Sequence, residues 1–209
     1  MGTKLVLDDI ADLREYERER EEFRAHVIAL KKRRRVGVGP IVTLVFENRD
    51  TIRFQIQEMA RAEKILSDEG IETELRIYNP LIPEPGHLAA TLFVELQSDE
   101  AMREWLPKLV GIETAVELRV GDGQSAAKGE EPGGRNRVVR CQVDPDHAEQ
   151  LTREDITAAV HYVHFALDDE EVAAFAAGPV SLAIDLDTYR HETLLGEEAI
   201  AELLGDLRG

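Results

Sequence analysis

The chain of 209 residues contains a single cysteine, Cys141, so it cannot form a disulfide bond within itself. Proteins of oxidising compartments often rely on several disulfides, and nothing here indicates such a compartment. No run of about 18 apolar residues is present, which excludes a membrane-spanning helix. Residues 1–9 include Asp8 and Asp9, where a signal peptide needs an apolar stretch. We therefore expect a cytoplasmic protein.

Familiar motifs of nucleotide, metal and nucleophile chemistry are also absent. Gly37-Val38-Gly39 follows a predicted helix instead of a strand, and Val42 stands where a dinucleotide fingerprint has its third glycine. The chain has no P-loop, Cys-x-x-Cys, His-Glu-x-x-His or Gly-x-Ser-x-Gly motif. A Glu-x-x-His at Glu84 and His87 lies in a proline-rich loop, and Cys141 alternates with apolar residues, as a core thiol does. The sequence thus indicates no cofactor and no metal ligand, and it leaves open whether the protein is an enzyme.

Basic side chains are few relative to acidic ones. The chain carries 25 Lys and Arg against 42 Asp and Glu, a net charge of −17. A surface of this sign repels nucleic-acid phosphates and anionic membranes, so we expect neither as a partner. It favours basic partners or cations, although solubility alone also explains it.

One basic run stands out against this acidic background. Its residues are Lys31, Lys32, Arg33, Arg34 and Arg35, which form a candidate interaction patch. The same run also complements the dipole at the end of the preceding helix, and that local role is the alternative interpretation.

A long N-terminal helix is predicted from Asp8 and Asp9 to about Arg35. Its apolar residues have helical spacing, interrupted from Glu15 to Glu22 by residues that are nearly all charged. Glu and Arg recur three residues apart in this interval, for example Glu17 and Arg20, which predicts ion pairs along the helix. We expect the helix to project in part from the body or to pack on another chain. A homo-oligomer through this helix is compatible with both.

The remaining chain is a mixture of strands and helices. Runs rich in β-branched and aromatic residues predict strands at 41–46, 51–54, 88–96, 115–120, 138–143, 157–167 and 180–185. Helical spacing predicts helices at 55–69, 71–78, 98–105, 168–178 and 197–207. There is no regular strand–helix–strand spacing, so we expect an α+β fold. It has a mainly antiparallel sheet, a long N-terminal helix and further helices packed on the sheet.

The composition divides the chain into three segments. Residues 122–136 are rich in Gly, Ser and Pro and poor in apolar residues, which predicts a flexible linker or loop. On either side lie a helix-rich α+β part, residues 1–121, and a smaller strand–helix part, residues 137–209. We expect these two parts to pack together as one unit.

A polar segment from Phe46 to Lys64, together with Tyr78 and Asn79, is the candidate binding surface. Many of its side chains can make two hydrogen bonds at once, and few of them are apolar. The candidate residues are Glu47, Asn48, Arg49, Gln55, Gln57, Glu58, Arg61, Glu63, Tyr78 and Asn79.

Two interpretations of this surface remain open. It is either a structural polar network, in which Glu63 pairs with Arg33, Arg34 or Arg61, or a catalytic or metal site. In the second interpretation the site residues are Glu58, Arg61, Glu63, Tyr78 and His161.

Strings along nearly the whole chain carry a resemblance to a known family. They are Phe23-Arg24, Lys31 to Val36, Phe46 to Thr51, Phe54 to Met59, Tyr78 to Pro83 and Ala174 to Val180. On these strings the chain resembles an uncharacterised bacterial family, domain of unknown function 3501, with residues 121–136 as its variable part.

The resemblance implies little about chemistry, because this family has no assigned activity. Genes of the family often lie beside genes for rubrerythrin-like and iron–sulfur oxidoreductase proteins, which implies a role in cytosolic redox or peroxide stress. We therefore expect an accessory or interaction protein that binds a redox protein of this kind. The alternative is a metal-dependent or small-molecule enzyme with a polar site around Glu58, Arg61 and Glu63.

Overall fold

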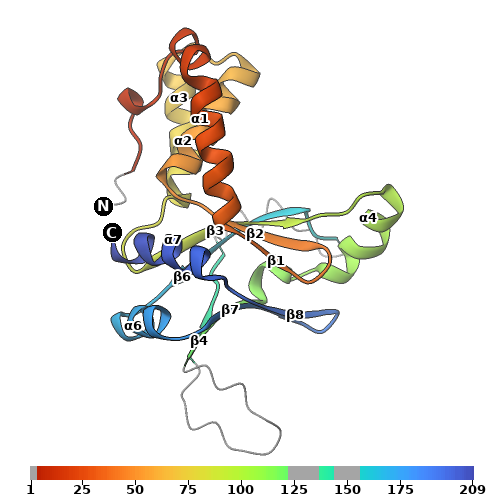
Figure 1. Ribbon diagram of the computed structural model, residues 1–209. Helices are drawn as coiled ribbons and strands as arrows, with labels where there is room; N and C mark the ends of the chain where they lie inside the picture. Colours follow the sequence, from red (N-terminus) through yellow and green to blue (C-terminus); the bar gives the residue numbers. More distant parts are fainter. Residues whose placement is uncertain (1–3, 122–136, 144–155) are drawn as a thin grey trace, which may run out of the picture.

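A computed structural model describes residues 4–121, 137–143 and 156–209. It shows a β-sheet body from which a bundle of helices projects as an arm (Figure 1). The linker predicted at 122–136 lies outside the described residues. Among the helices of the described ranges, none is both long enough and apolar enough to cross a membrane.

The body contains two antiparallel sheets of four strands each. The strand order is β1-β2-β3-β6 in the first sheet and β5-β4-β7-β8 in the second. The strands are β1 (Arg35–Val38), β2 (Val42–Phe46), β3 (His87–Val94), β4 (Val116–Val120), β5 (Arg137–Arg140), β6 (Val160–Ala166), β7 (Val180–Leu186) and β8 (Tyr189–Leu194).

The inward-facing side chains of both sheets form one apolar core. Leu44, Leu92 and Val163 of the first sheet are fully buried in it, as are Leu118 and Leu182 of the second. Helices α6 (Asp169–Ala177) and α7 (Glu197–Arg208) pack against each other, and α7 also contacts β3, while α4 (Asp99–Trp105) follows β3 in the chain. The core therefore takes residues from both sides of the predicted linker.

The arm consists of α1 (Leu13–Arg33), α2 (Arg49–Glu63) and α3 (Asp68–Tyr78). Helix α1 runs toward the body, α2 runs away from it, and α3 returns (Figure 1). A second, small apolar core packs α2 and α3 against each other and against the segment that precedes α1. Its buried residues are Leu5, Ile52, Ile56, Leu75, Leu81 and Ile82.

The two antiparallel sheets and surrounding helices confirm the predicted α+β class, but several predicted boundaries are wrong. Residues 51–54 are not a strand and belong to α2, because Asn48 caps that helix and exchanges two hydrogen bonds with Thr51. The helix predicted at 55–69 ends at Glu63, since Lys64 adopts a left-handed conformation. The N-terminal helix likewise ends at Arg33, and β1 and β8 were not predicted.

Tyr189 joins β8 to the turn between β1 and β2. Its hydroxyl donates a hydrogen bond to the Val38 carbonyl at 2.7 Å and accepts one from the backbone N–H of Ile41 at 3.3 Å. Gly39 lies in this turn with φ +73°, and a Cβ there would lie 2.5 Å from the Tyr189 hydroxyl and from the His191 ring. The turn therefore requires glycine for both its backbone conformation and its contact with β8.

We expect Gly39→Ala to lower the free energy of unfolding by about 2 kcal/mol, because it combines an unfavourable left-handed backbone with a steric clash. Urea denaturation measures this loss. Gly37→Ala is the matched control, since a Cβ at Gly37 meets no atom within 4 Å. Equal stability of the two variants would contradict the role assigned to the Gly39–Tyr189 contact.

Candidate functional site

A ladder of ion pairs joins α1 to α2 along the arm. Glu17 pairs with Arg61, Arg20 with Glu58, and Glu19 with Arg53. Glu17 and Arg20, which were expected to pair with each other along α1, instead each bind a residue of α2. The charged interval of the N-terminal helix thus forms ion pairs within the arm, where the two antiparallel helices present opposite charges to each other.

Glu58 is the most fully bound carboxylate of this ladder. Arg20 donates to both of its oxygens at 2.8 and 2.9 Å, and the buried Tyr16 hydroxyl donates to Oε1 at 2.8 Å. The hydrogen bonds from Arg20, followed by the one from Tyr16, hold the pKa of Glu58 below its usual range. Burial and the bond to Glu58 raise the pKa of Tyr16. This geometry fixes an ionised carboxylate in place, which suits a structural clamp between the helices.

Two predicted residues, Gln57 and Asn79, hold the segment that precedes α1. The buried side-chain amide of Gln57 accepts from the backbone N–H of Ala11 at 2.8 Å and donates to its carbonyl at 3.2 Å. Asn79 makes the same two bonds to Leu5, each at 2.9 Å. Each amide therefore satisfies both backbone groups of one residue, as a neighbouring strand would.

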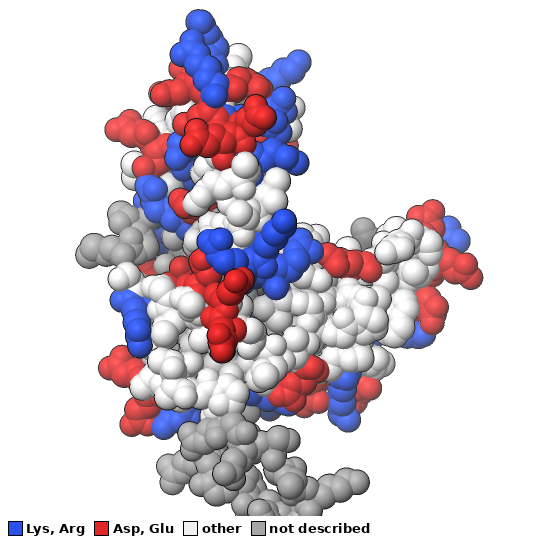
Figure 2. Space-filling model, in the orientation of Figure 1, with Lys and Arg blue, Asp and Glu red and all other residues white. Residues whose placement is uncertain are grey.

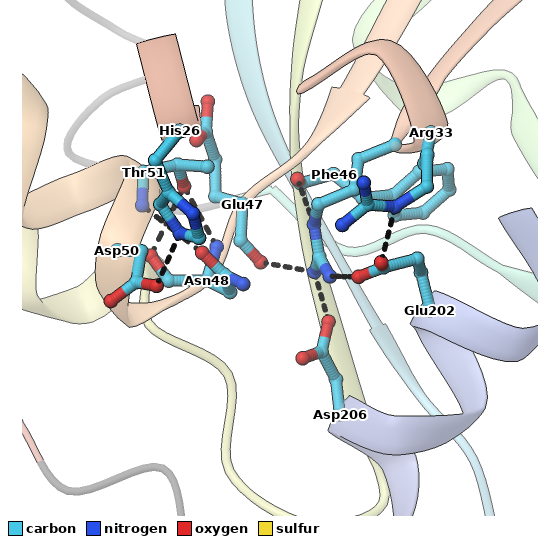
Figure 3. Close-up of polar contacts among 10 residues, drawn as sticks. His26, Arg33, Phe46, Glu47, Asn48, Asp50, Thr51, Glu202 and Asp206 are labelled. Carbon is cyan, nitrogen blue, oxygen red and sulfur yellow. Dashed lines mark hydrogen bonds and ion pairs between the residues drawn. The ribbon is translucent and has the colours of Figure 1, made fainter. Parts of the chain in front are cut away.

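Arg34 lies at the base of the arm, and only 1% of its surface is exposed. Its guanidinium donates to the carbonyls of Phe46 and Glu47 at 2.9 and 3.2 Å and pairs with Asp206 and Glu202 of α7 (Figure 3). Burial raises the pKa of Asp206, an effect that the charge of Arg34 opposes. The cluster thus joins the end of α1, the end of β2 and α7, so Arg34 is not available to a partner.

The other residues of the basic run differ in their surroundings. Arg33 binds Glu202 at 2.5 Å, and Arg35 forms an exposed pair with Glu95. Lys31 is half-buried and Lys32 is exposed. Three of the five basic residues are therefore engaged within the chain, which leaves the lysines as the part of the patch that faces outward.

The predicted residues near the start of α2 also make contacts within the chain. Glu47 is buried, and its Oε1 accepts a hydrogen bond from Thr91 at 2.7 Å. Asn48 caps α2, and Asp50 of the first turn lies 3.2 Å from the His26 ring (Figure 3). Arg49 binds Asp9 at 2.5 Å. These side chains fix where the arm leaves the body.

The remaining candidates lie in separate environments. Gln55 is half-buried on α2, whereas Glu63 is exposed at its end. Tyr78 packs beside the small core of the arm. His161 is buried in the body, with its Nε2 2.8 Å from the Thr157 hydroxyl. Of the five residues of the proposed catalytic or metal site, Glu58, Arg61 and Glu63 thus share α2, whereas Tyr78 lies on α3 and His161 on β6.

The expected partners of Glu63 are bound elsewhere. Arg33 and Arg34 pair with Glu202 and Asp206, and Arg61 pairs with Glu17, so the predicted pairs with Glu63 are wrong. Within the ranges that the structure describes, no three His, Cys, Asp or Glu side chains come together in a group able to hold a metal ion. Burial raises the pKa of the Cys141 thiol to about 11, which makes it a poor nucleophile at neutral pH.

The tip of the arm carries an apolar pocket that the sequence did not predict. Leu66, in the link between α2 and α3, is 82% exposed at this pocket. Three aspartates line its rim, and it contains no Lys or Arg. Its large apolar residues are Leu7, Ile10, Leu13, Ile65, Leu66 and Ile71, and its aspartates are Asp8, Asp12 and Asp68.

The pocket was missed because Ile65 and Leu66 fit the apolar spacing of a helix continuing to residue 69. The helix in fact ends before them, and both side chains are left in a short connection. Ser67, followed by two acidic residues, is the helix-start signal that predicts this break, since its side chain accepts from the N–H of Gly70.

Comparisons with known proteins agree with the fold. The family model described as Protein of unknown function (DUF3501) matches residues 4–207. A crystal structure of a novel protein of unknown function from Burkholderia pseudomallei K96243 is 37% identical, with a TM-score of 0.83, over 98% of this chain and 100% of that chain. No curated protein matches the chain.

We expect Arg34→Met to lower the free energy of unfolding by about 3–5 kcal/mol, because it leaves Asp206 without its buried counter-charge, whereas Glu202 keeps its pair with Arg33. Chemical denaturation measures the change. Arg35→Met is the control, since its pair with Glu95 is about half exposed and such pairs contribute about 0–1 kcal/mol. A small loss for Arg34→Met would show that the cluster does not hold the arm to the body.

The pKa of Glu58 predicts how the arm responds to acid. Because its pKa is lower in the folded state, the stabilisation is present above the ordinary value of 4.5 and is lost as the pH falls below it. We expect Glu58→Gln to be less stable than the wild type by about 1 kcal/mol at pH 7, with the difference shrinking toward pH 3. Thermal unfolding across this pH range tests it; a difference independent of pH would contradict it.

Proposed function

This chain belongs to the DUF3501 family of proteins of unknown function, and we propose that it is an accessory protein that binds a partner protein through the tip of its arm. The observation that carries this proposal is the apolar pocket around Leu66. The side chain of Leu66 is nearly free in water, and burying a leucine fully contributes about 1.5–3 kcal/mol. A partner that covers this pocket gains that energy without any rearrangement of the body.

The chemistry of the pocket limits the kind of partner. Aliphatic side chains and aspartates line it together, and Asp8 and Asp68 are exposed. An apolar side chain flanked by Lys or Arg complements both features. Anionic lipid and nucleic acid are repelled by the same aspartates and by the net charge of −17. A basic, partly apolar protein segment is therefore the proposed ligand.

The resemblance to the family supplies the proposed class of partner. We take the partner to be a redox protein of a cytosolic peroxide-stress system, either rubrerythrin-like or an iron–sulfur oxidoreductase, with both proteins in the cytoplasm. An enzymatic role around Glu58, Arg61 and Glu63 is not preferred, because Glu58 and Arg61 are bound to α1.

Binding of purified partners tests the proposal. We expect a rubrerythrin-like protein or an iron–sulfur oxidoreductase from the same organism to bind the wild type, and Leu66→Asp to weaken this binding at least tenfold. Leu194→Asp is the control, because Leu194 is 66% exposed on β8, in the body. Its dissociation constant should equal that of the wild type. Biolayer interferometry under anaerobic conditions gives the three values.

The outcomes separate the two parts of the proposal. If the wild type binds one of these proteins and both leucine variants bind equally well, the tip is not the docking site. If the wild type binds neither protein, the redox partner class is wrong. Equal weakening by both leucine variants would assign the effect to a general loss of structure and contradict a specific site.

A further inference from the structure

The outer face of α1 is a second surface that none of the described residues outside this helix lines. Ala25 and Ala29 lie between longer side chains of the same helix and leave a shallow hollow. Ile28 projects beside them with 40% of its surface exposed. Figure 2 shows an uncharged patch on the arm, between an acidic cluster toward the tip and a basic cluster at the base. The hollow shares no lining residue with the pocket around Leu66.

Two of the charges beside this patch, those of Glu21 and Lys32, form no ion pair within the described part of the chain. Glu21 lies one turn before Ala25, and Lys32 lies one turn after Ile28. Neither forms an ion pair with any of the described residues, whereas Glu17 and Arg20 of the same helix are bound to α2. The outer face therefore presents an apolar centre with a negative end and a positive end.

We propose that the outer face of α1 binds the same face of a second copy of this chain, with the two helices antiparallel about a two-fold axis. An axis at the level midway between residues 26 and 27 places Glu21 of one copy opposite Lys32 of the other. The same axis places Ala25 at the level of Ile28, on the same side of the helix. Both pairs share this midpoint, so one arrangement satisfies the charges and fills the hollow together.

A second copy fits this face better than an unrelated protein. A two-fold interface must be complementary to itself, because each copy contributes the same residues. A helix with one acidic end, one basic end and an apolar centre meets that condition only in the antiparallel orientation. The symmetry forms each favourable pair twice, so the charge pattern of one helix defines the whole interface.

Charge exchange between the two positions tests the proposal. We expect the wild type to sediment with the mass of two chains. Glu21→Lys and Lys32→Glu should each weaken the dimer at least tenfold, since each brings like charges together twice. The double variant E21K/K32E should restore the wild-type dissociation constant to within about threefold, because the pairs re-form with reversed sign.

The matched control is Glu22→Lys, which makes the same change of charge at an exposed neighbouring position pointing about 100° away around the helix. It should leave the dimer unchanged. Circular dichroism of every variant checks that the fold is retained. A monomeric wild type, single variants without effect, or a double variant that stays monomeric would each overturn the proposal. The tip pocket is untouched by these changes, so this result is independent of the partner experiment.

Discussion

The buried guanidinium of Arg34 is the constraint on which the rest of the molecule depends. A guanidinium with 1% exposure must have its N–H groups bound, and those of Arg34 donate to two carbonyls at the end of β2 and to two carboxylates of α7. Arg34 and these partners come from three parts of the chain that meet only in the folded state. The position of this one side chain therefore holds the end of α1, the end of β2 and the C-terminal helix together. Burial of this contact removes the Asp206 carboxylate from water and thereby raises its pKa.

In the arm, polar interactions position the helices, whereas in the body an apolar core holds the elements together. The arm has only a small cluster of buried apolar residues, so ion pairs from α1 to α2 and amide contacts to the N-terminal segment set the positions of its helices. Because these polar side chains bind one another, few of them are left to bind a ligand or to act in catalysis. Leu66 and Ile28 are apolar and exposed, and each belongs to one of the two surfaces that we propose for docking.

Local sequence patterns predicted the elements whose energetics are local. The strand at residues 88–96 follows from strict alternation, and the helix after Asp168 follows from its cap. Residues 51–54 were assigned to a strand because they are β-branched and aromatic, but the hydrogen bonds between Asn48 and Thr51 decide for a helix. The contacts of Gln57 with Ala11 and of Arg34 with Asp206 join residues far apart in the chain. Local spacing does not predict such contacts, so the sequence identifies these side chains as one polar segment but not the residues that they bind.

The distribution of charge gives the two surfaces different roles. The chain carries far more acidic than basic residues, and its arginines at the base of the arm are bound to acidic residues of the same chain. A basic partner is therefore attracted to the protein as a whole, and the aspartates around Leu66 direct it to the tip. Two copies with this net charge repel each other at long range, so association between them needs local contacts between opposite charges. In the proposed dimer, Lys32 lies opposite Glu21 of the second copy and provides such a contact. Salt screens an attraction at this short range less than the long-range repulsion.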